Sequence, residues 1–180
     1  MKKIITHLLS LSLMITFLTA CGAAHVRTEK SSSDLHQYKN IYLGKVDIHS
    51  QEEAAKTNEE LQLKMVEWEG FARTELKNYV EKSEYTLVDT LDNKDTTLAV
   101  DLDIDLVYGN RAARYFGGFG AGKGSVDSVL KVTDPKTQEV KFHAIAESDL
   151  SVGAFGGSME NVLKTNIQKL IEQYPRAAKQ

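Results

Sequence analysis

A strict two-residue alternation of apolar and polar side chains runs from Thr97 to Tyr108, and no other feature of the chain constrains its fold as strongly. The apolar positions of this segment are Leu98, Val100, Leu102, Ile104 and Leu106, and the carboxylates between them are Asp101, Asp103 and Asp105. Because successive side chains of a β-strand point to opposite faces, the alternation predicts a strand with one buried face and one solvated face. The chain therefore needs a sheet whose apolar face is covered by helices.

The rest of the chain supplies partners for this strand. Asn40–Ile48 and Tyr85–Thr90 are rich in apolar and β-branched residues and predict two further strands, the first with an irregularity at Gly44. Ser125–Thr133 and Glu139–Leu150 flank a turn-forming Asp-Pro-Lys-Thr segment and predict a hairpin.

Two segments have the three- and four-residue spacing of apolar side chains that predicts an amphipathic helix. The first begins near Glu53–Asn58 and ends near Lys82; the second follows Ser158, which fits an N-cap, and stops at Pro175. The first strand, long helix and next strand favour a right-handed parallel crossover. We predict an α/β (α+β) domain with a single mixed, largely antiparallel sheet of about five strands and both helices mostly on one face.

The first twenty residues have the order of a secretory signal peptide, with two lysines, a mostly apolar run and small residues at its end. The run ends in Leu18-Thr19-Ala20-Cys21, which resembles the lipobox of bacterial lipoproteins. The resemblance implies lipidation at Cys21, the only cysteine of the chain, and attachment to a membrane through acyl chains such as palmitate. Gly22 in place of aspartate implies, by the Gram-negative sorting rule, the outer membrane on its periplasmic side. An ordinary signal peptide with a stray cysteine, or an uncleaved transmembrane helix, is the alternative.

Charge and composition indicate how the chain after residue 20 is organised and which partners are excluded. Without Met1–Ala20 the chain has 20 basic and 25 acidic side chains and a formal charge of −5, which excludes a general attraction to nucleic acid. Residues 21–38 are polar and lack apolar periodicity, so we expect a lipidated flexible tether that holds the domain roughly 20 Å from the lipid. A single globular domain then occupies residues 39–176.

Tyr108–Gly124, YGNRAARYFGGFGAGKG, lies between two predicted strands and is too long for a tight turn, which is typical of a functional loop. Its charged and aromatic side chains are Arg111, Arg114, Lys123, Tyr115, Phe116 and Phe119. We expect Phe116 and Phe119 to anchor a protein partner and the arginines to pair with its acidic groups. The alternative is that the rings fold back onto the sheet edge and the cations pair with Asp101–Asp105.

The same loop contains Gly117-x4-Gly122-Lys123, most of the phosphate-binding loop of nucleotide hydrolases. That loop needs a serine or threonine after the lysine and must open a helix, whose first amides bind phosphate. Here Gly124 follows the lysine, and the next residues are β-like. We therefore expect no nucleotide and no other cofactor.

No catalytic or metal-binding set is evident in the sequence. Asp101–Asp105 resembles the start of a calcium loop, but the glycine and glutamate that such a loop requires are absent, so we expect a solvated acidic face. The histidines are scattered singly, which gives no support for a metal site. Gly156–Glu160 departs from a nucleophile elbow at its last residue. We expect that the protein is not an enzyme. The alternative is an envelope hydrolase that acts on cell wall or lipid, with Ser158 and His143 or the Asp101–Asp105 row in its site.

A family resemblance rests on the two glycine-rich runs. GNRAARYFGGFGAGKG, followed by the hairpin and by GAFGG at Gly153–Gly157, resembles the bacterial lipoprotein family called domain of unknown function 4410, over most of Tyr38–Tyr174. That family has no established activity. More distantly, the order of elements resembles periplasmic domains of outer-membrane lipoproteins such as the curli secretion channel protein and the activators of penicillin-binding proteins. The resemblance implies a non-enzymatic envelope module that binds another envelope protein or assembles as a homo-oligomer.

Overall fold

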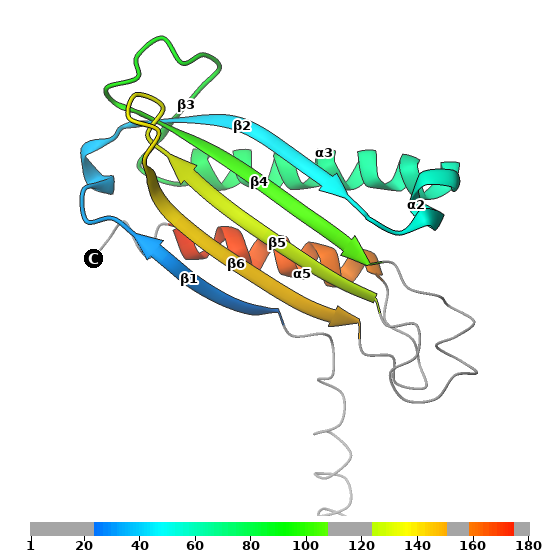
Figure 1. The fold of residues 1–180 in the computed structure, drawn as a ribbon. Helices are drawn as coiled ribbons and strands as arrows, with labels where there is room; N and C mark the ends of the chain where they lie inside the picture. Colours follow the sequence, from blue (N-terminus) through cyan, green and yellow to red (C-terminus); the bar gives the residue numbers. More distant parts are fainter. Residues whose placement is uncertain (1–23, 108–123, 151–158, 175–180) are drawn as a thin grey trace, which may run out of the picture.

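The computed structural model describes residues 24–107, 124–150 and 159–174. They form one six-stranded mixed sheet in the order β1-β6-β5-β4-β2-β3, with the long helices on one face (Figure 1). The strands are β1 His25–Ser31, β2 Asn40–His49, β3 Thr86–Val88, β4 Thr97–Val107, β5 Gly124–Thr133 and β6 Val140–Leu150. The predicted fold class, a single mixed sheet with helices on one face, is confirmed.

The helices are α2 Glu53–Thr57, α3 Glu59–Glu81 and α5 Met159–Ile171, and η1, Leu35–Gln37, is a single 3-10 turn. The side chain of Asn58 caps α3 by accepting a hydrogen bond from the Leu61 backbone N–H at 3.2 Å. Trp68 in the middle of α3 is buried, as the helical spacing predicts. Among the described residues, no helix has the length and apolar composition needed to cross a membrane.

The core lies between the helices and one face of the sheet. All five apolar positions of the β4 alternation are at most 3% exposed, which confirms the predicted buried face. Helix α3 packs on β2, and α5 packs on β5 and β6. Asn166 of α5 is fully buried and donates hydrogen bonds to the carbonyl oxygens of Val126 and Ala146 and to the Ser148 hydroxyl. This amide joins the C-terminal helix to two neighbouring strands.

Strand β2 has a parallel neighbour on each side, β3 and β4. The β2–α3–β3 segment is therefore the parallel crossover that the sequence predicts. The pairing of β2 with β4 shifts register between Leu43 and Val46, which confirms the irregularity expected at Gly44. A Cβ at Gly44 would overlap Asp101 Oδ1, and that oxygen accepts a hydrogen bond from the Lys45 backbone N–H at 2.7 Å. Glycine at this bulge leaves room for the aspartate side chain.

The prediction of a flexible tether over residues 21–38 is wrong for the part that forms β1. His25–Ser31 pairs antiparallel with β6 and forms one edge of the sheet, and η1 places Leu35 in the core, 1% exposed. The segment lacks apolar periodicity because an edge strand is held by backbone hydrogen bonds and charged side chains. Arg27 Nη1, for example, lies 2.8 Å from Glu147 Oε1 on β6.

Candidate functional site

Three strands meet at one end of the sheet. The register places Val107, the last residue of β4, beside Ser125, and Gly124, the first residue of β5, beside Leu150, the last residue of β6. Strand β4 ends, β5 begins and β6 ends at this edge, which we call the loop end (Figure 1).

Most of the residues that the sequence singled out lie in the segments 108–123 and 151–158 or before β1. Outside the described residues lie Cys21, Arg111, Arg114, Tyr115, Phe116, Phe119, Lys123 and Ser158. The residue after the phosphate-loop motif, Gly124, begins strand β5 and not a helix. A phosphate-binding loop must open a helix, so the rejection of a nucleotide site agrees with the observed strand.

A row of ionisable residues crosses the sheet face opposite the helices, close to the loop end. Cross-strand pairing places Asp105 of β4 beside Asp127 of β5, and Asp127 beside Glu147 of β6. His49 of β2 stands beside Asp105 at one end of the row, and His25 of β1 stands beside Glu147 at the other. Three carboxylates abreast repel one another, because neighbouring strands are only about 4.8 Å apart.

The middle of this row is its least favourable position for a negative charge. Although Asp127 is exposed, partial desolvation by its neighbours raises its pKa above the usual value, and the charges of Glu147, Asp105 and Asp149 raise it further. At the β1 side, Arg27 Nη1 pairs with Glu147 at 2.8 Å. Arg27 therefore offsets the charge of Glu147, and the other two carboxylates of the row, Asp105 and Asp127, lie on β4 and β5.

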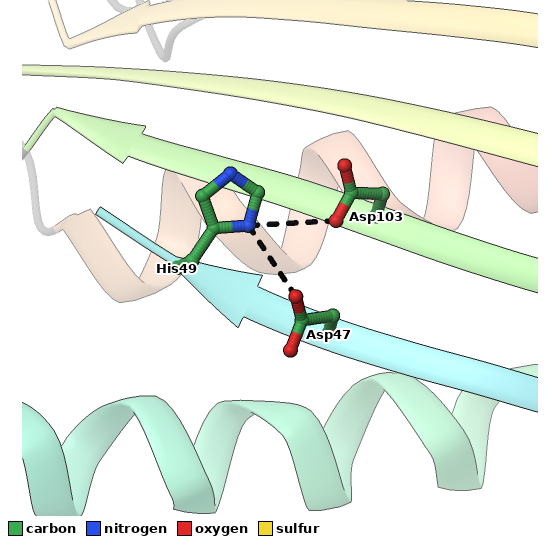
Figure 2. Close-up of side chains that lie close together, drawn as sticks. All are labelled: Asp47, His49 and Asp103. Atoms are coloured by element: carbon green, nitrogen blue, oxygen red, sulfur yellow. Dashed lines mark ion pairs between the residues drawn. The ribbon is translucent and has the colours of Figure 1, made fainter. Parts of the chain in front are cut away.

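His49 contacts three carboxylates at the β2 side of the row, and Figure 2 shows two of them, Asp47 and Asp103. Its Nδ1 lies 3.4 Å from Asp103 Oδ1 and 3.6 Å from Asp47 Oδ2, and its Nε2 lies 4.0 Å from Asp105 Oδ1. One ligand atom from each of Asp47, His49 and Asp103 lies within 4.8 Å of the other two. We call these three residues the His49 cluster. Lys45 Nζ also reaches Asp47 Oδ2, at 2.9 Å.

Parallel pairing of two strands builds the His49 cluster. Asp47 and His49 alternate with Val46 and Ile48, which are buried against the helices, so both polar side chains point to the opposite face. The register then sets Asp47 directly beside Asp103.

The expectation that the histidines are isolated is wrong for His49, which lies beside Asp103 and Asp105 of the strand that was expected to have a merely solvated acidic face. The signal is the Asp-x-His spacing of β2 beside the Asp-x-Asp spacing of β4. This spacing indicates a cluster only when the register of β2 with β4 is known, and the sequence did not predict that pairing. His143, the histidine of the hydrolase alternative, lies on β6 with its Nδ1 2.9 Å from Glu29 Oε2.

No protein-family model and no curated protein sequence matches the chain. Among solved structures, it is similar to the PelC dodecamer from Paraburkholderia phytofirmans, with a TM-score of 0.53 and 12% identity over 87% of this chain and 99% of that chain. It is also similar to a DUF4136 family protein from Bacteroides thetaiotaomicron, with a TM-score of 0.49 and 9% identity over 88% of this chain and 98% of that chain. A neuraminyllactose-binding hemagglutinin homolog from Helicobacter pylori has a TM-score of 0.45 and 12% identity, covering 82% of this chain and 87% of that chain. The likeness to PelC shows a shared fold, and the resemblance to the 4410 family is not confirmed.

Proposed function

We propose that the protein is a non-enzymatic, lipid-anchored module of the bacterial cell envelope that assembles with copies of itself or with another envelope protein through residues 111–123. The observation that carries the proposal is that the described strands on either side of residues 108–123, and the strand before residues 151–158, all have these ends at the loop end. Glycines allow close approach of two backbones, and the rings and arginines of 108–123 are the side chains that most often anchor protein interfaces.

The fold likeness supports assembly. The PelC structure that shares this fold is a dodecamer. Closed rings need one surface patch that contacts a different patch on the next copy. In this proposal the loop end supplies one patch, and its basic side chains pair with acidic groups of the next protein.

The position of β1 supports a short attachment to the membrane. Only residues 22–24 separate Cys21 from His25, and an extended chain spans at most about 3.5 Å per residue. Cys21 with its lipid would then hold the start of β1 within roughly 15 Å of the bilayer. His25 pairs with Glu147 near the end of β6, so β1 starts near the loop end. This arrangement would place the loop end of the sheet near the membrane surface.

The first test measures what residues 108–123 contact in cells. A photo-crosslinking amino acid at position 119, with Cys21 intact, should give a discrete adduct with a second copy or with one other envelope protein. A probe at Arg73, on the exposed side of α3, serves as the matched control and should give no such adduct. If the adducts at position 119 do not differ from those at Arg73, residues 111–123 are not the interface.

The second test separates self-assembly from partner binding. The mass of the lipid-free domain that begins at Ala24 should exceed the monomer mass, and Arg114→Ala or Phe119→Ala should return it to the monomer. Arg73→Ala removes an exposed arginine of α3 and should leave the mass unchanged. A monomeric wild-type domain that still gives the adduct in cells would indicate a different envelope protein as the partner.

A further inference from the structure

We propose that Asp47, His49 and Asp103 bind a divalent transition-metal ion such as Zn²⁺ on the open face of the sheet. This inference does not depend on the proposed assembly role, because it rests only on described residues of β2 and β4. The site would make the chain a metal-binding protein with one ion per copy.

The separations between the ligand atoms suit a small ion. Zn²⁺ lies about 2.0–2.1 Å from nitrogen and oxygen ligands, so the ligands of a tetrahedral site are roughly 3.4 Å apart. His49 Nδ1 is 3.4 Å from Asp103 Oδ1 and 3.6 Å from Asp47 Oδ2. The Asp47 and Asp103 oxygens lie within 4.8 Å of each other, so a rotation of one carboxylate completes three corners. Water or a further protein oxygen can supply the fourth corner.

Two polar atoms at the His49 cluster make no hydrogen bond. His49 Nδ1 is shielded from solvent and makes no hydrogen bond, although it faces two carboxylates. Asp105 Oδ1, which lies 4.0 Å from the other ring nitrogen, is likewise shielded and without a hydrogen bond. Because shielded polar atoms are normally paired, the arrangement favours a cation that Nδ1 and the two carboxylates can share.

Asp105 has the position of a supporting residue. A histidine that binds a metal through one ring nitrogen usually donates its other N–H to a carboxylate, which fixes the tautomer of the ring. With its proton on Nε2 toward Asp105, His49 directs the lone pair of Nδ1 toward Asp47 and Asp103. Asp105 is therefore a positioning residue of the proposed site, and the other three supply the ligands.

The ligand types select the class of ion. Imidazole nitrogen together with carboxylate suits Zn²⁺ and its transition-metal neighbours, whereas Ca²⁺ needs six to eight oxygen ligands and Mg²⁺ keeps several waters. Lys45 is the competing cation, with Nζ 2.9 Å from Asp47 Oδ2, but its side chain is 72% exposed and can swing into solvent. His143 and Glu29 form a single pair at 2.9 Å and provide an internal comparison.

Titration of the untagged domain with ZnCl₂ tests the site, with calorimetry for affinity and histidine ring NMR signals for the residue. We expect one Zn²⁺ per chain with a Kd below about 100 µM, and a shift of the His49 ring signals. His49→Ala and Asp103→Asn should each weaken binding at least tenfold, and Asp105→Asn about tenfold. His143→Ala should leave the affinity unchanged.

Two results would contradict the proposed metal site. A wild-type Kd above about 1 mM, or a His49→Ala variant that binds Zn²⁺ as tightly as wild type, would show that the cluster is only a set of ion pairs. Far-ultraviolet circular dichroism of each variant checks that the fold is retained. His49→Gln, which keeps a polar side chain of similar length, serves as a second variant with the same expected loss.

Discussion

Asn166 shows how one buried side chain can hold a helix on a sheet. Its amide donates to Val126 O at 3.0 Å, Ala146 O at 3.2 Å and Ser148 Oγ at 2.9 Å, and the residue is fully buried. The helical spacing places Asn166 among the apolar positions of α5, but it gives no reason for an amide there. The reason is the row of acceptors on β5 and β6, which only the folded sheet provides.

We predict that Asn166→Leu lowers the free energy of unfolding by about 2 kcal/mol, because acceptors on two strands lose a buried partner. Urea denaturation of the lipid-free domain measures this change. Asn161→Leu alters an exposed amide of the same helix and should change stability by less than about 0.5 kcal/mol. Equal effects of the two substitutions would show that the buried hydrogen bonds contribute little.

The aspartate in the middle of the ionisable row leads to a prediction for pH. The pKa of Asp127 is raised in the folded state, first by partial desolvation and then by Glu147, Asp105 and Asp149. Its protonated form therefore favours folding, and this contribution is complete below the pKa of the unfolded chain and is lost as pH rises through the folded value. Asp127→Asn should raise stability at pH 7 by about 0.5 kcal/mol, allowing for solvent screening and cross-strand repulsion, and by nothing near pH 3.

Thermal unfolding of wild type and Asp127→Asn between pH 3 and pH 7 checks this expectation, without added metal. Asp89→Asn changes an exposed carboxylate beyond β3 and is the matched control. A destabilised Asp127→Asn protein at pH 7 would mean that the charge of Asp127 is compensated in the folded protein.

The bulge of strand β2 depends on Gly44. Gly44→Ala would push its methyl group into Asp101 Oδ1, which is fixed by the Lys45 backbone N–H at 2.7 Å. We predict a loss of about 1–3 kcal/mol in urea denaturation, in the range of overpacked sites. In an Asp101→Ala background the same substitution should cost much less, because the overlapping oxygen is gone. Additive effects of the two substitutions would contradict the steric explanation.

Strand β1 protects an edge of the sheet. A chain that begins at Ser32 lacks β1 and leaves one side of β6 without backbone partners. Strand β6 then becomes the edge in place of the charged β1, and exposed strand edges promote association. We predict a loss of a few kcal/mol, at about 1 kcal/mol per lost hydrogen bond, together with concentration-dependent aggregation. Size-exclusion chromatography and denaturation of this chain, compared with one that begins at Ala24, measure both effects. A monomeric, equally stable shorter chain would make β1 dispensable.

The elements that the sequence predicted well are those with strong periodicity. The β4 alternation, the apolar stripe of α3 and the hairpin of β5 and β6 each bury a regular set of side chains, so local pattern and tertiary packing agree. Strand β1 was missed because seven residues with mostly exposed side chains carry no such pattern. The His49 cluster was missed for a different reason: it arises from the parallel register of β2 with β4, and a register between distant strands is a property of the whole sheet.

One face of the sheet is covered by α3 and α5 (Figure 1). The other face carries the ionisable row. The covered face accounts for stability, whereas the open face and the loop end hold the residues on which both proposals depend. Assembly and metal binding can therefore be tested by separate substitutions. Arg114→Ala should change the mass of the assembly without changing Zn²⁺ affinity.

The pairing of β1 with β6 also determines when the fold can be completed. Arg27 and Glu147, which meet across this pair, are 120 residues apart in the chain. Contacts this distant form late, because the chain between them must be ordered first. We predict that pulse-labelled hydrogen exchange during refolding protects the amides of β5 and β6 before those of β1. The first strand to be synthesised would then be the last to join the sheet, and the segment next to Cys21 stays an open chain until the C-terminal half has folded.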